Sequence, residues 1–206
     1  MRESRRAYWE GIYTNKSERE VSWFQENPAA SLELIVPLGV TAASAIIDVG
    51  GGSSRLVDNL VQRGFEDVTV LDFSEAALEA AKARLRRDAA HVHWVVADVT
   101  TWEPLKTYEI WHDRAAFHFL TEEHDRSAYV ARLARALKAG GYAIIATFAI
   151  DGPERCSGLP AVRYDPASLG KTLGRAFELV DTRRHTHATP WGTEQLFQFS
   201  VFRRSA

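Results

Sequence analysis

The feature that most constrains this fold is a short apolar run, Ser44–Val49 (SAIIDV), which leads directly into Gly50, Gly51 and Gly52. A β-branched run of this length is typical of a buried strand. The segment after the glycines, 54–63, has apolar residues at helical spacing, and Gly64 can end that helix. A strand, a glycine turn and a helix in this order are typical of a parallel α/β sheet.

The same alternation continues along the chain. Ser74 is an expected N-cap for the second helix. Strands separated by helices of this length form right-handed βαβ units in a parallel sheet covered on both faces. We therefore predict a doubly wound α/β fold. The expected strands are 44–49, 67–71, 91–97, 108–112 and 142–148, and a third helix is expected over 123–138, ended by Gly140 and Gly141.

The two ends of the chain differ from this core. Residues 177–186 and 194–203 resemble two strands joined without a helix, so we expect the sheet to finish in an antiparallel hairpin. Residues 1–40 contain several aromatic side chains among charges and indicate two or three helices. These helices either cover one sheet edge or form a lid over a ligand. We expect one domain over 1–206: a lid (1–40), a core (41–150) and a substrate-side loop with the hairpin (151–206).

Charge and cysteine content limit the partners. The chain has 25 Lys+Arg against 27 Asp+Glu, a net charge of −2, whereas proteins that bind nucleic acids or anionic membranes normally have a basic excess. The N-terminal residues contain no apolar signal-peptide core, and Cys156 is the single cysteine. We expect a cytoplasmic monomer or homodimer with no nucleic-acid or membrane partner and no bound metal.

The glycine loop does not match the two commonest nucleotide loops. The Lys of a phosphate-binding loop is missing, and Arg55 occupies the final glycine position of a dinucleotide loop. Asp48, at the end of the strand, would repel a pyrophosphate. An acidic group at this place suits a ligand that carries positive charge.

Two more aspartates follow the next two predicted strands. Asp72 stands about 20 residues beyond the loop, where a carboxylate can accept both ribose hydroxyls. Asp98 can accept a hydrogen bond from an exocyclic amine, and Phe73 can pack on a purine face. Each aspartate alone is equally explained as a helix cap or turn former. Three at successive strand ends indicate a nucleoside with a cationic tail and no phosphate.

These segments resemble a known family. IIDVGGGSS, VLDFS, VVADVTTW and LKAGGYAIIATF are similar to the successive motifs of class I S-adenosylmethionine-dependent methyltransferases, which have a Rossmann-like, mostly parallel seven-stranded sheet. The resemblance implies S-adenosylmethionine as cofactor and S-adenosylhomocysteine as product. It places the three glycines beside the cofactor, Asp48 near its amino-acid end, Asp72 at the ribose, and Asp98 with Val99 at the adenine.

Two subgroups of that family are the most similar. The N-terminal YWEGIYTNKSEREVSWF and the later WHDRAAFHFL resemble both small thiol or thiopurine methyltransferases and elongation-factor lysine methyltransferases. The second subgroup carries Asp-Lys/Arg-Gly-Thr where this chain has Asp113-Arg114-Ala115-Ala116. We expect Tyr13 and Trp23 to approach the cofactor or the acceptor.

Methyl transfer needs positioning more than a catalytic side chain. We predict that Asp113 orients the reacting groups and name His118 as the candidate base, with a helix cap and a buried neutral imidazole as the alternatives. Arg114 either pairs with Asp113 or binds an anionic acceptor, and we place it at the acceptor together with Phe24 and Trp191. Cys156 is expected either as a thiol without a role or as part of the acceptor wall.

The expected activity is methyl transfer to a small-molecule nucleophile, for example a thiol. A protein-lysine N-methyltransferase is the first alternative. A cofactor-binding regulatory protein without catalysis is an alternative from another class.

Overall fold

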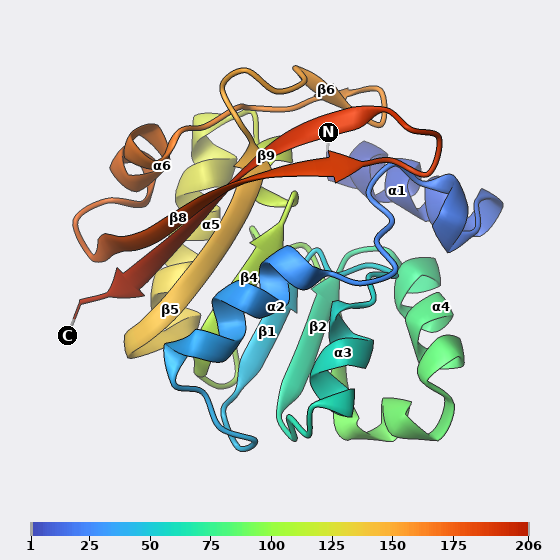
Figure 1. The fold of residues 1–206 in the computed structure, drawn as a ribbon, viewed down its shortest axis with the longest axis horizontal. Coiled ribbons are helices and arrows are strands. Elements are labelled where there is room, and N and C mark those ends of the chain that lie inside the picture. Colours follow the sequence, from blue (N-terminus) through green and yellow to red (C-terminus); the bar gives the residue numbers. More distant parts are fainter. Residues whose placement is uncertain (1, 206) are drawn as a thin grey trace.

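The computed structural model describes residues 2–205, with side chains from Arg5 onward, and Met1 and Ala206 lie outside this range. Its main feature is a seven-stranded sheet in the order β3-β2-β1-β4-β5-β9-β8 (Figure 1). The first five strands pair in parallel, whereas β9 runs antiparallel to both β5 and β8. The predicted fold class is confirmed. The strands of this sheet are β1 (Ile46–Val49), β2 (Val68–Asp72), β3 (Val92–Val96), β4 (Tyr108–Arg114), β5 (Leu137–Phe148), β8 (Phe177–Ala188) and β9 (Glu194–Arg204).

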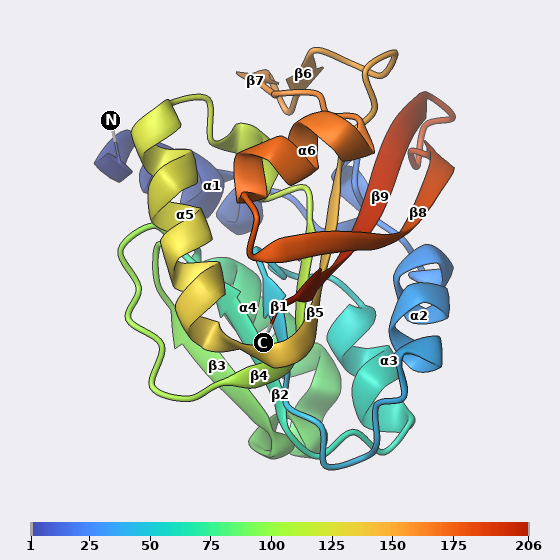
Figure 2. The same ribbon diagram turned by 90° about the vertical axis from the view of Figure 1, so that its left-hand side faces the viewer.

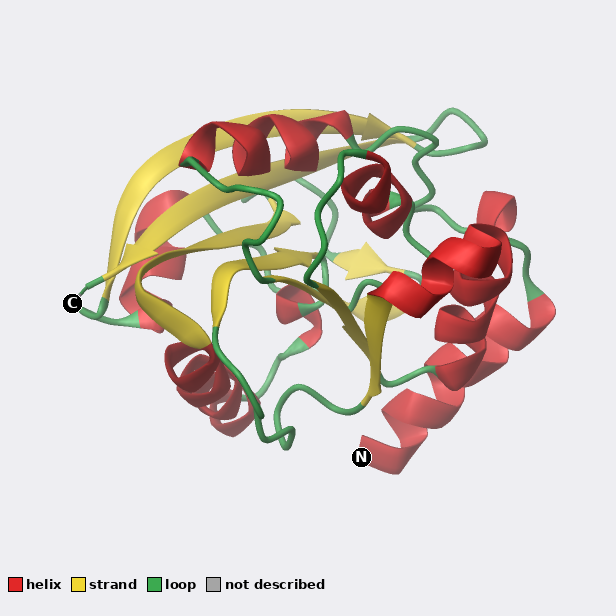
Figure 3. Cartoon of the chain, turned by 90° about the horizontal axis from the view of Figure 1, so that it is seen from below, coloured by secondary structure: helices red, strands yellow, loops and turns green. Residues whose placement is uncertain are grey.

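Helices cover both faces of the sheet (Figures 2 and 3). Ile46 and Ile144 pack among side chains of α2, α3 and α4, whereas the next residues, Ile47 and Ile145, pack among those of α5 and α6. Successive strand side chains point to opposite faces, so buried runs such as Ile46–Val49 supply both cores. The helices are α1 (Arg2–Asn15), α2 (Ala29–Ile35), α3 (Leu56–Gln62), α4 (Glu75–Leu85), α5 (Glu123–Ala136) and α6 (Pro166–Leu173), with short 3₁₀ turns η1 (Glu18–Glu20), η2 (Val36–Leu38), η3 (Arg86–His91) and η4 (Phe117–Phe119).

Two sequence predictions differ from the structure in this core. Helix α5 ends at Ala136, and Gly140 and Gly141 lie inside β5 instead of ending the helix. A Cβ on Gly141 would stand 2.9 Å from the Glu109 carbonyl oxygen, where the pairing of β4 with β5 shifts register. The glycines therefore allow two backbones to approach at an irregular point in the sheet.

The segment after β5 contains elements that we did not predict. A small hairpin, β6 (Arg155–Cys156) and β7 (Leu159–Pro160), precedes α6. The Asp165 carboxylate accepts a hydrogen bond from the Ser168 amide, and Pro166 occupies the first turn of α6. A cap followed by proline is a helix-start signal that was present in the sequence.

The N-terminal segment divides into two parts. Helix α2 packs on one face of the sheet, where Leu32 and Ile35 are buried. Helix α1 instead lies near the carboxyl ends of the strands, beside α4 (Figure 1). The Glu10 carboxylate accepts a hydrogen bond from the Ala76 amide at the start of α4. Arg5 pairs with Asp125 in α5, so α1 bridges the two helices.

Candidate functional site

The candidate active site is a cavity at the carboxyl edge of the parallel strands. Ligands of open α/β sheets bind at this edge. Its lining comes from the strand ends, α1, and residues near 119, 156 and 196. The lining side chains and backbone belong to Arg5, Trp9, Tyr13, Trp23, Val49, Gly50, Leu71, Asp72, Phe73, Ala97, Asp98, Val99, Arg114, Ala115, Ala116, Phe119, Leu120, Cys156, Gln195 and Phe197.

Asp72 is the most perturbed carboxyl group of the cavity. Burial raises the pKa of Asp72 to about 7, while hydrogen bonds from the backbone of Ser74 and Gly52 act in the opposite direction. Its Oδ1 accepts from the Ser74 amide at 2.8 Å, so the side chain also shapes the turn into α4. Ser74 caps that helix as predicted. Asp72 thus fits both interpretations given above. Its buried carboxyl group lines the cavity, and the same group holds its own turn.

Asp98, two residues after β3, also holds its own turn. Its Oδ1 accepts hydrogen bonds from the amide and the hydroxyl of Thr100, at 2.8 Å and 2.7 Å. Phe73 and Val99 line the same cavity. The structure thus brings together the four residues that we assigned to a nucleoside.

The glycine loop is tightly packed. Gly50 lines the cavity with a φ of +67°, and a Cβ there would stand 2.5 Å from the Cβ of Ala116. The ends of β1 and β4 therefore touch at the point where the strand order reverses. Gly52 has a φ of +51°, and a Cβ there would stand 2.5 Å from the Tyr13 hydroxyl. Only glycine lets the loop and the N-terminal helix approach this closely.

Asp48 and Gly51 take a different role from the one expected. A Cβ on Gly51 would stand 2.7 Å from Asp48 Oδ2, so this glycine makes room for the aspartate. Asp48 Oδ1 lies 2.7 Å from Nδ1 of His112 in β4, and Nε2 of His112 lies 2.9 Å from the Ser31 hydroxyl in α2. All three side chains are buried. The chain Asp48–His112–Ser31 joins two strands to α2, and the Asp48 carboxylate is turned into this network.

An aromatic group from the N-terminal segment covers the cavity. The ring of Trp23 lies edge-on to Trp9 at 5.4 Å and to Tyr13 at 5.9 Å, and Trp9 contacts Phe119 at 5.0 Å. Burial raises the pKa of Tyr13, and the charge of Asp72 raises it further. The placement of Tyr13 and Trp23 agrees with the expectation of a lid.

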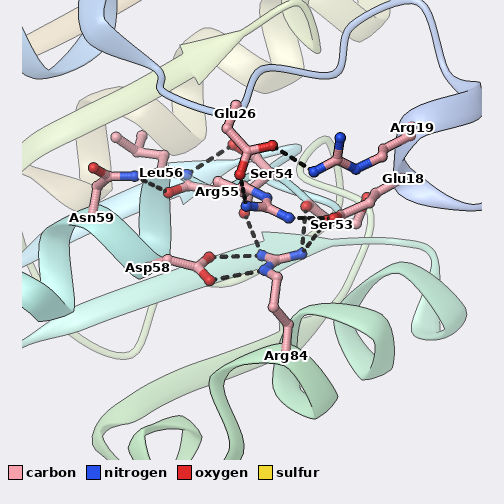
Figure 4. A network of polar contacts seen from close by, with 10 residues as sticks. All are labelled: Glu18, Arg19, Glu26, Ser53, Ser54, Arg55, Leu56, Asp58, Asn59 and Arg84. Atoms are coloured by element: carbon pink, nitrogen blue, oxygen red, sulfur yellow. Dashed lines mark hydrogen bonds and ion pairs between the residues drawn. The ribbon is translucent and has the colours of Figure 1, made fainter.

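An ion-pair network fastens this segment to the glycine loop (Figure 4). Glu18 pairs with both Arg55 and Arg84, and Arg84 also donates to the carbonyl oxygens of Ser53 and Ser54 at 3.0 Å and 2.9 Å. Partial burial raises the pKa of Glu18, but the hydrogen bonds and charges of the two arginines lower it on balance. The loop and the cover are therefore held by the same arginines.

Asp113 lies in a buried network beside the cavity. Its carboxylate accepts hydrogen bonds from the amides of Ala116 and Phe117 and from the Tyr129 hydroxyl, the last at 2.7 Å. Burial raises its pKa to about 6. This arrangement is the capping alternative, because both oxygens hold the turn after β4. It gives no geometric support to the role of Asp113 at the reacting centre.

His118 is fully buried between Phe119 and Phe148, with ring centroids 4.4 Å and 4.8 Å away. Burial and the nearby charge of Arg114 lower its pKa to about 3. The ring is therefore neutral and enclosed in the core, which agrees with the buried neutral imidazole given above as the alternative to a catalytic base.

The three residues assigned to the acceptor separate in space. Arg114 lines the cavity, as does Cys156, whose pKa burial raises to about 11. Phe24 lies beneath the guanidinium groups of Arg19 and Arg55, at 5.4 Å and 5.5 Å. Trp191 is 59% exposed in the turn between β8 and β9. The structure leaves Phe24 and Trp191 outside the cavity wall.

Several wall residues were missed by the sequence analysis. Trp9, Phe119 and the pair Gln195 and Phe197 come from three distant parts of the chain. The sequence predicted a strand over 194–203, but nothing in that prediction placed Gln195 and Phe197 in a cavity wall.

Comparison with known proteins identifies the fold and the domain. A family profile described as a methyltransferase domain matches residues 46–141, from β1 into β5. The chain carries a methyltransferase domain. The matched part contains the glycine loop, Asp72 and Asp98. The predicted resemblance is therefore confirmed at the level of the class.

Three known proteins are similar to this chain beyond the residues that the profile matches. EEF1A lysine methyltransferase 2 of Danio rerio is 26% identical over 153 residues, which is 67% of this chain and 66% of that protein. A structure solved in work on the conversion of a disulfide bond into a thioacetal group during echinomycin biosynthesis has a TM-score of 0.74 and 21% identity, and the match covers 97% of this chain and 93% of that one. The 1,6-didemethyltoxoflavin-N1-methyltransferase of Burkholderia thailandensis has a TM-score of 0.70 and 20% identity, with 98% and 85% covered.

In residues 2–205, no helix is long and apolar enough to span a bilayer. Within the same range, no group of three metal-binding side chains comes together.

Proposed function

We propose that this protein transfers a methyl group from S-adenosylmethionine to a small-molecule acceptor. The observation that carries the proposal is one cavity lined by two unlike sets of residues. The first set, which we call the cofactor end, has the strand-end carboxyl groups of Asp72 and Asp98, and the second set, which we call the acceptor end, consists of aromatic rings from distant segments.

The first end fits the cofactor's nucleoside. The buried Asp72 carboxyl, with a pKa raised to about 7, gains from ribose hydroxyl donors that favour its ionised form. Asp98 with Val99 is suited to the adenine edge, and Phe73 to the adenine face. Gly50 lets the backbone pass close to the ligand. The bound cofactor supplies an electrophilic methyl group on a sulfonium.

The second end positions the acceptor and excludes water. Trp9, Trp23 and Phe119 pack against one another over the cavity, which favours an in-line approach of a bound nucleophile and keeps water away from it. A thiolate acceptor needs no protein base, which agrees with the neutral, buried state of His118. The N1-methyltransferase with bound 1,6-didemethyltoxoflavin shows that a protein of this fold holds a small acceptor.

A protein lysine is the second candidate acceptor. The similarity to EEF1A lysine methyltransferase 2 favours it. One charge in the cavity wall opposes it, because the guanidinium of Arg114 would repel a lysine ammonium group close to it.

Methyl-labelled S-adenosylmethionine distinguishes the candidates. The protein is incubated separately with a small-molecule cell extract and with dialysed cell protein, and the label is followed in each fraction. We expect label in small molecules, and about 5-fold to 150-fold less label with Asp72→Ala at a cofactor concentration below the wild-type dissociation constant. Label in protein alone would favour the lysine acceptor, and no label in either fraction would favour a binding protein without catalysis.

A further inference from the structure

Arg114 is a partly buried cation that forms no ion pair within residues 5–205. The sequence left two partners open, Asp113 and an anionic ligand. In the structure both oxygens of Asp113 are occupied by Ala116, Phe117 and Tyr129. Adjacent residues of β4 point to opposite faces, so the Asp113 carboxylate and the Arg114 guanidinium are separated by the strand.

One edge of the guanidinium is already fixed. Nη1 donates a hydrogen bond to the Trp23 carbonyl oxygen at 2.9 Å, and the group lies 5.1 Å from the centre of the Phe197 ring. Trp23 and Phe197 both line the cavity. The guanidinium is thereby held in place between the N-terminal cover and β9.

The other edge has no partner. Nε and Nη2 are both buried, and within residues 5–205 neither has a hydrogen-bond partner. These two nitrogens form the side of the guanidinium that binds a carboxylate through two parallel hydrogen bonds. Buried donors and charges are normally paired, so this edge indicates a missing ligand group.

The neighbouring titratable groups do not neutralise the charge. Burial keeps Cys156 a thiol, with a pKa raised to about 11, and keeps His118 and His187 neutral, with pKa values lowered to about 3 and 4. Burial also lowers the pKa of His185. The charge of Asp48 reaches Arg114, but the Asp48 carboxylate is hydrogen-bonded to His112.

We propose that Arg114 binds a carboxylate group of the methyl acceptor through Nε and Nη2. This inference rests on the proposed function and specifies its substrate class: a small acid whose apolar part packs on Phe197 and Trp23. Arg114 lies inside the part matched by the methyltransferase profile, whereas the two residues that hold its guanidinium, Trp23 and Phe197, lie outside that part. These two contacts favour the acceptor over the carboxylate of the cofactor's amino-acid tail as the ligand of Arg114.

The test uses acids and their amides on protein saturated with S-adenosylhomocysteine. Calorimetry measures the dissociation constants of benzoate and benzamide, phenylacetate and phenylacetamide, and 3-mercaptopropionate and its amide. Because hydrogen bonds to a charged group contribute about 1.5–3 kcal/mol, we expect at least one acid to bind about tenfold tighter than its amide. Arg114→Gln should bring that ratio near one, and Arg114→Lys should retain part of it. Arg87→Gln removes the same charge from an exposed position and should leave the ratio unchanged.

A separate arm tests the cofactor as the source of the carboxylate. 5′-Methylthioadenosine lacks the amino-acid tail of S-adenosylhomocysteine. A tail-dependent loss of affinity in Arg114→Gln, together with equal binding of acids and amides, would assign the carboxylate to the cofactor. An acid-to-amide ratio near one in wild type, with no tail-dependent loss, would overturn the carboxylate site. A ratio unchanged by Arg114→Gln would do the same. Binding of S-adenosylhomocysteine by wild type tests the proposed function independently.

Discussion

The two ends of the cavity are built in opposite ways. The cofactor end comes from successive strand ends, with Asp72 and Asp98 each holding its own turn through a backbone amide. The acceptor end is assembled from α1, the end of β4, the β6 segment and β9, which are far apart in the sequence. Proteins that share this strand order can share a binding site made by the turns at the strand ends. A site made by distant segments can vary between such proteins without disturbing the sheet. Under the proposed function, the locally built residues hold the cofactor common to the class, and the residues from distant segments set the acceptor.

Asp72→Ala should produce the largest loss at the cofactor end. Removing a buried acceptor leaves its donors unpaired, and we expect the affinity for S-adenosylhomocysteine to fall by about 1–3 kcal/mol, or about 5-fold to 150-fold. Calorimetry measures the change. Asp67→Ala is the matched control, because Asp67 immediately precedes β2 at the opposite end of the strand and pairs with Lys106. Equal losses in both variants would mean that the effect is structural.

Trp23→Ala should damage the acceptor end in preference to the cofactor end. It removes the ring that contacts Trp9 and Tyr13, so we expect turnover to fall by about tenfold to 100-fold through lost positioning. Steady-state kinetics and S-adenosylhomocysteine affinity are measured together. The control is Phe24→Ala, which removes the adjacent aromatic ring that lies under Arg19 and Arg55. If the two variants lose turnover equally, the prediction that Trp23 positions the acceptor is wrong.

Binding of S-adenosylhomocysteine should release protons from Asp72, which belongs to the cofactor end. Burial raises the pKa of Asp72 to about 7 in the free protein, so the group is about half protonated at pH 7. Ribose donors favour the carboxylate and lower this pKa, and binding should therefore release about half a proton at pH 7. The affinity for S-adenosylhomocysteine should therefore weaken as the pH falls below 7.

Calorimetry in buffers with different ionisation enthalpies measures this proton count. Asp72→Asn should abolish the release, because an amide does not titrate. Wild-type binding without any linked proton would show that the ribose lies elsewhere in the cavity.

The smallest expected effect concerns the ion pairs that join the N-terminal segment to the glycine loop. Glu18→Gln weakens the pairs with Arg55 and Arg84 in Figure 4, which are partly exposed and contribute less than about 1 kcal/mol. We expect a small, salt-dependent loss of thermal stability. Glu79→Gln provides a surface comparison, since Glu79 pairs with Lys82 within α4. A loss of several kcal/mol in Glu18→Gln would mean that the cover and the glycine loop fold as one unit.

Local sequence signals predicted much of the fold and the cofactor end. The β-branched runs and Ser74 predicted strands and a helix start within a few residues of their observed positions. The strand-end aspartates predicted Asp72 and Asp98 in one cavity because parallel strands bring their carboxyl ends to one edge. The prediction that Gly140 and Gly141 end a helix was wrong, because glycine can end a helix and can also permit an irregular strand.

What the sequence determined by itself is therefore the order of elements and the chemistry at the ends of the strands. The tertiary structure decided the partners of the buried charges. Asp48 faces His112 and Ser31, Asp113 holds the turn after β4, and one edge of Arg114 remains without a protein partner. The physical reason is that turn and strand signals act over a few residues. The pairing of a buried charge instead depends on which distant side chains share its low-dielectric surroundings, and only the packed chain fixes those neighbours.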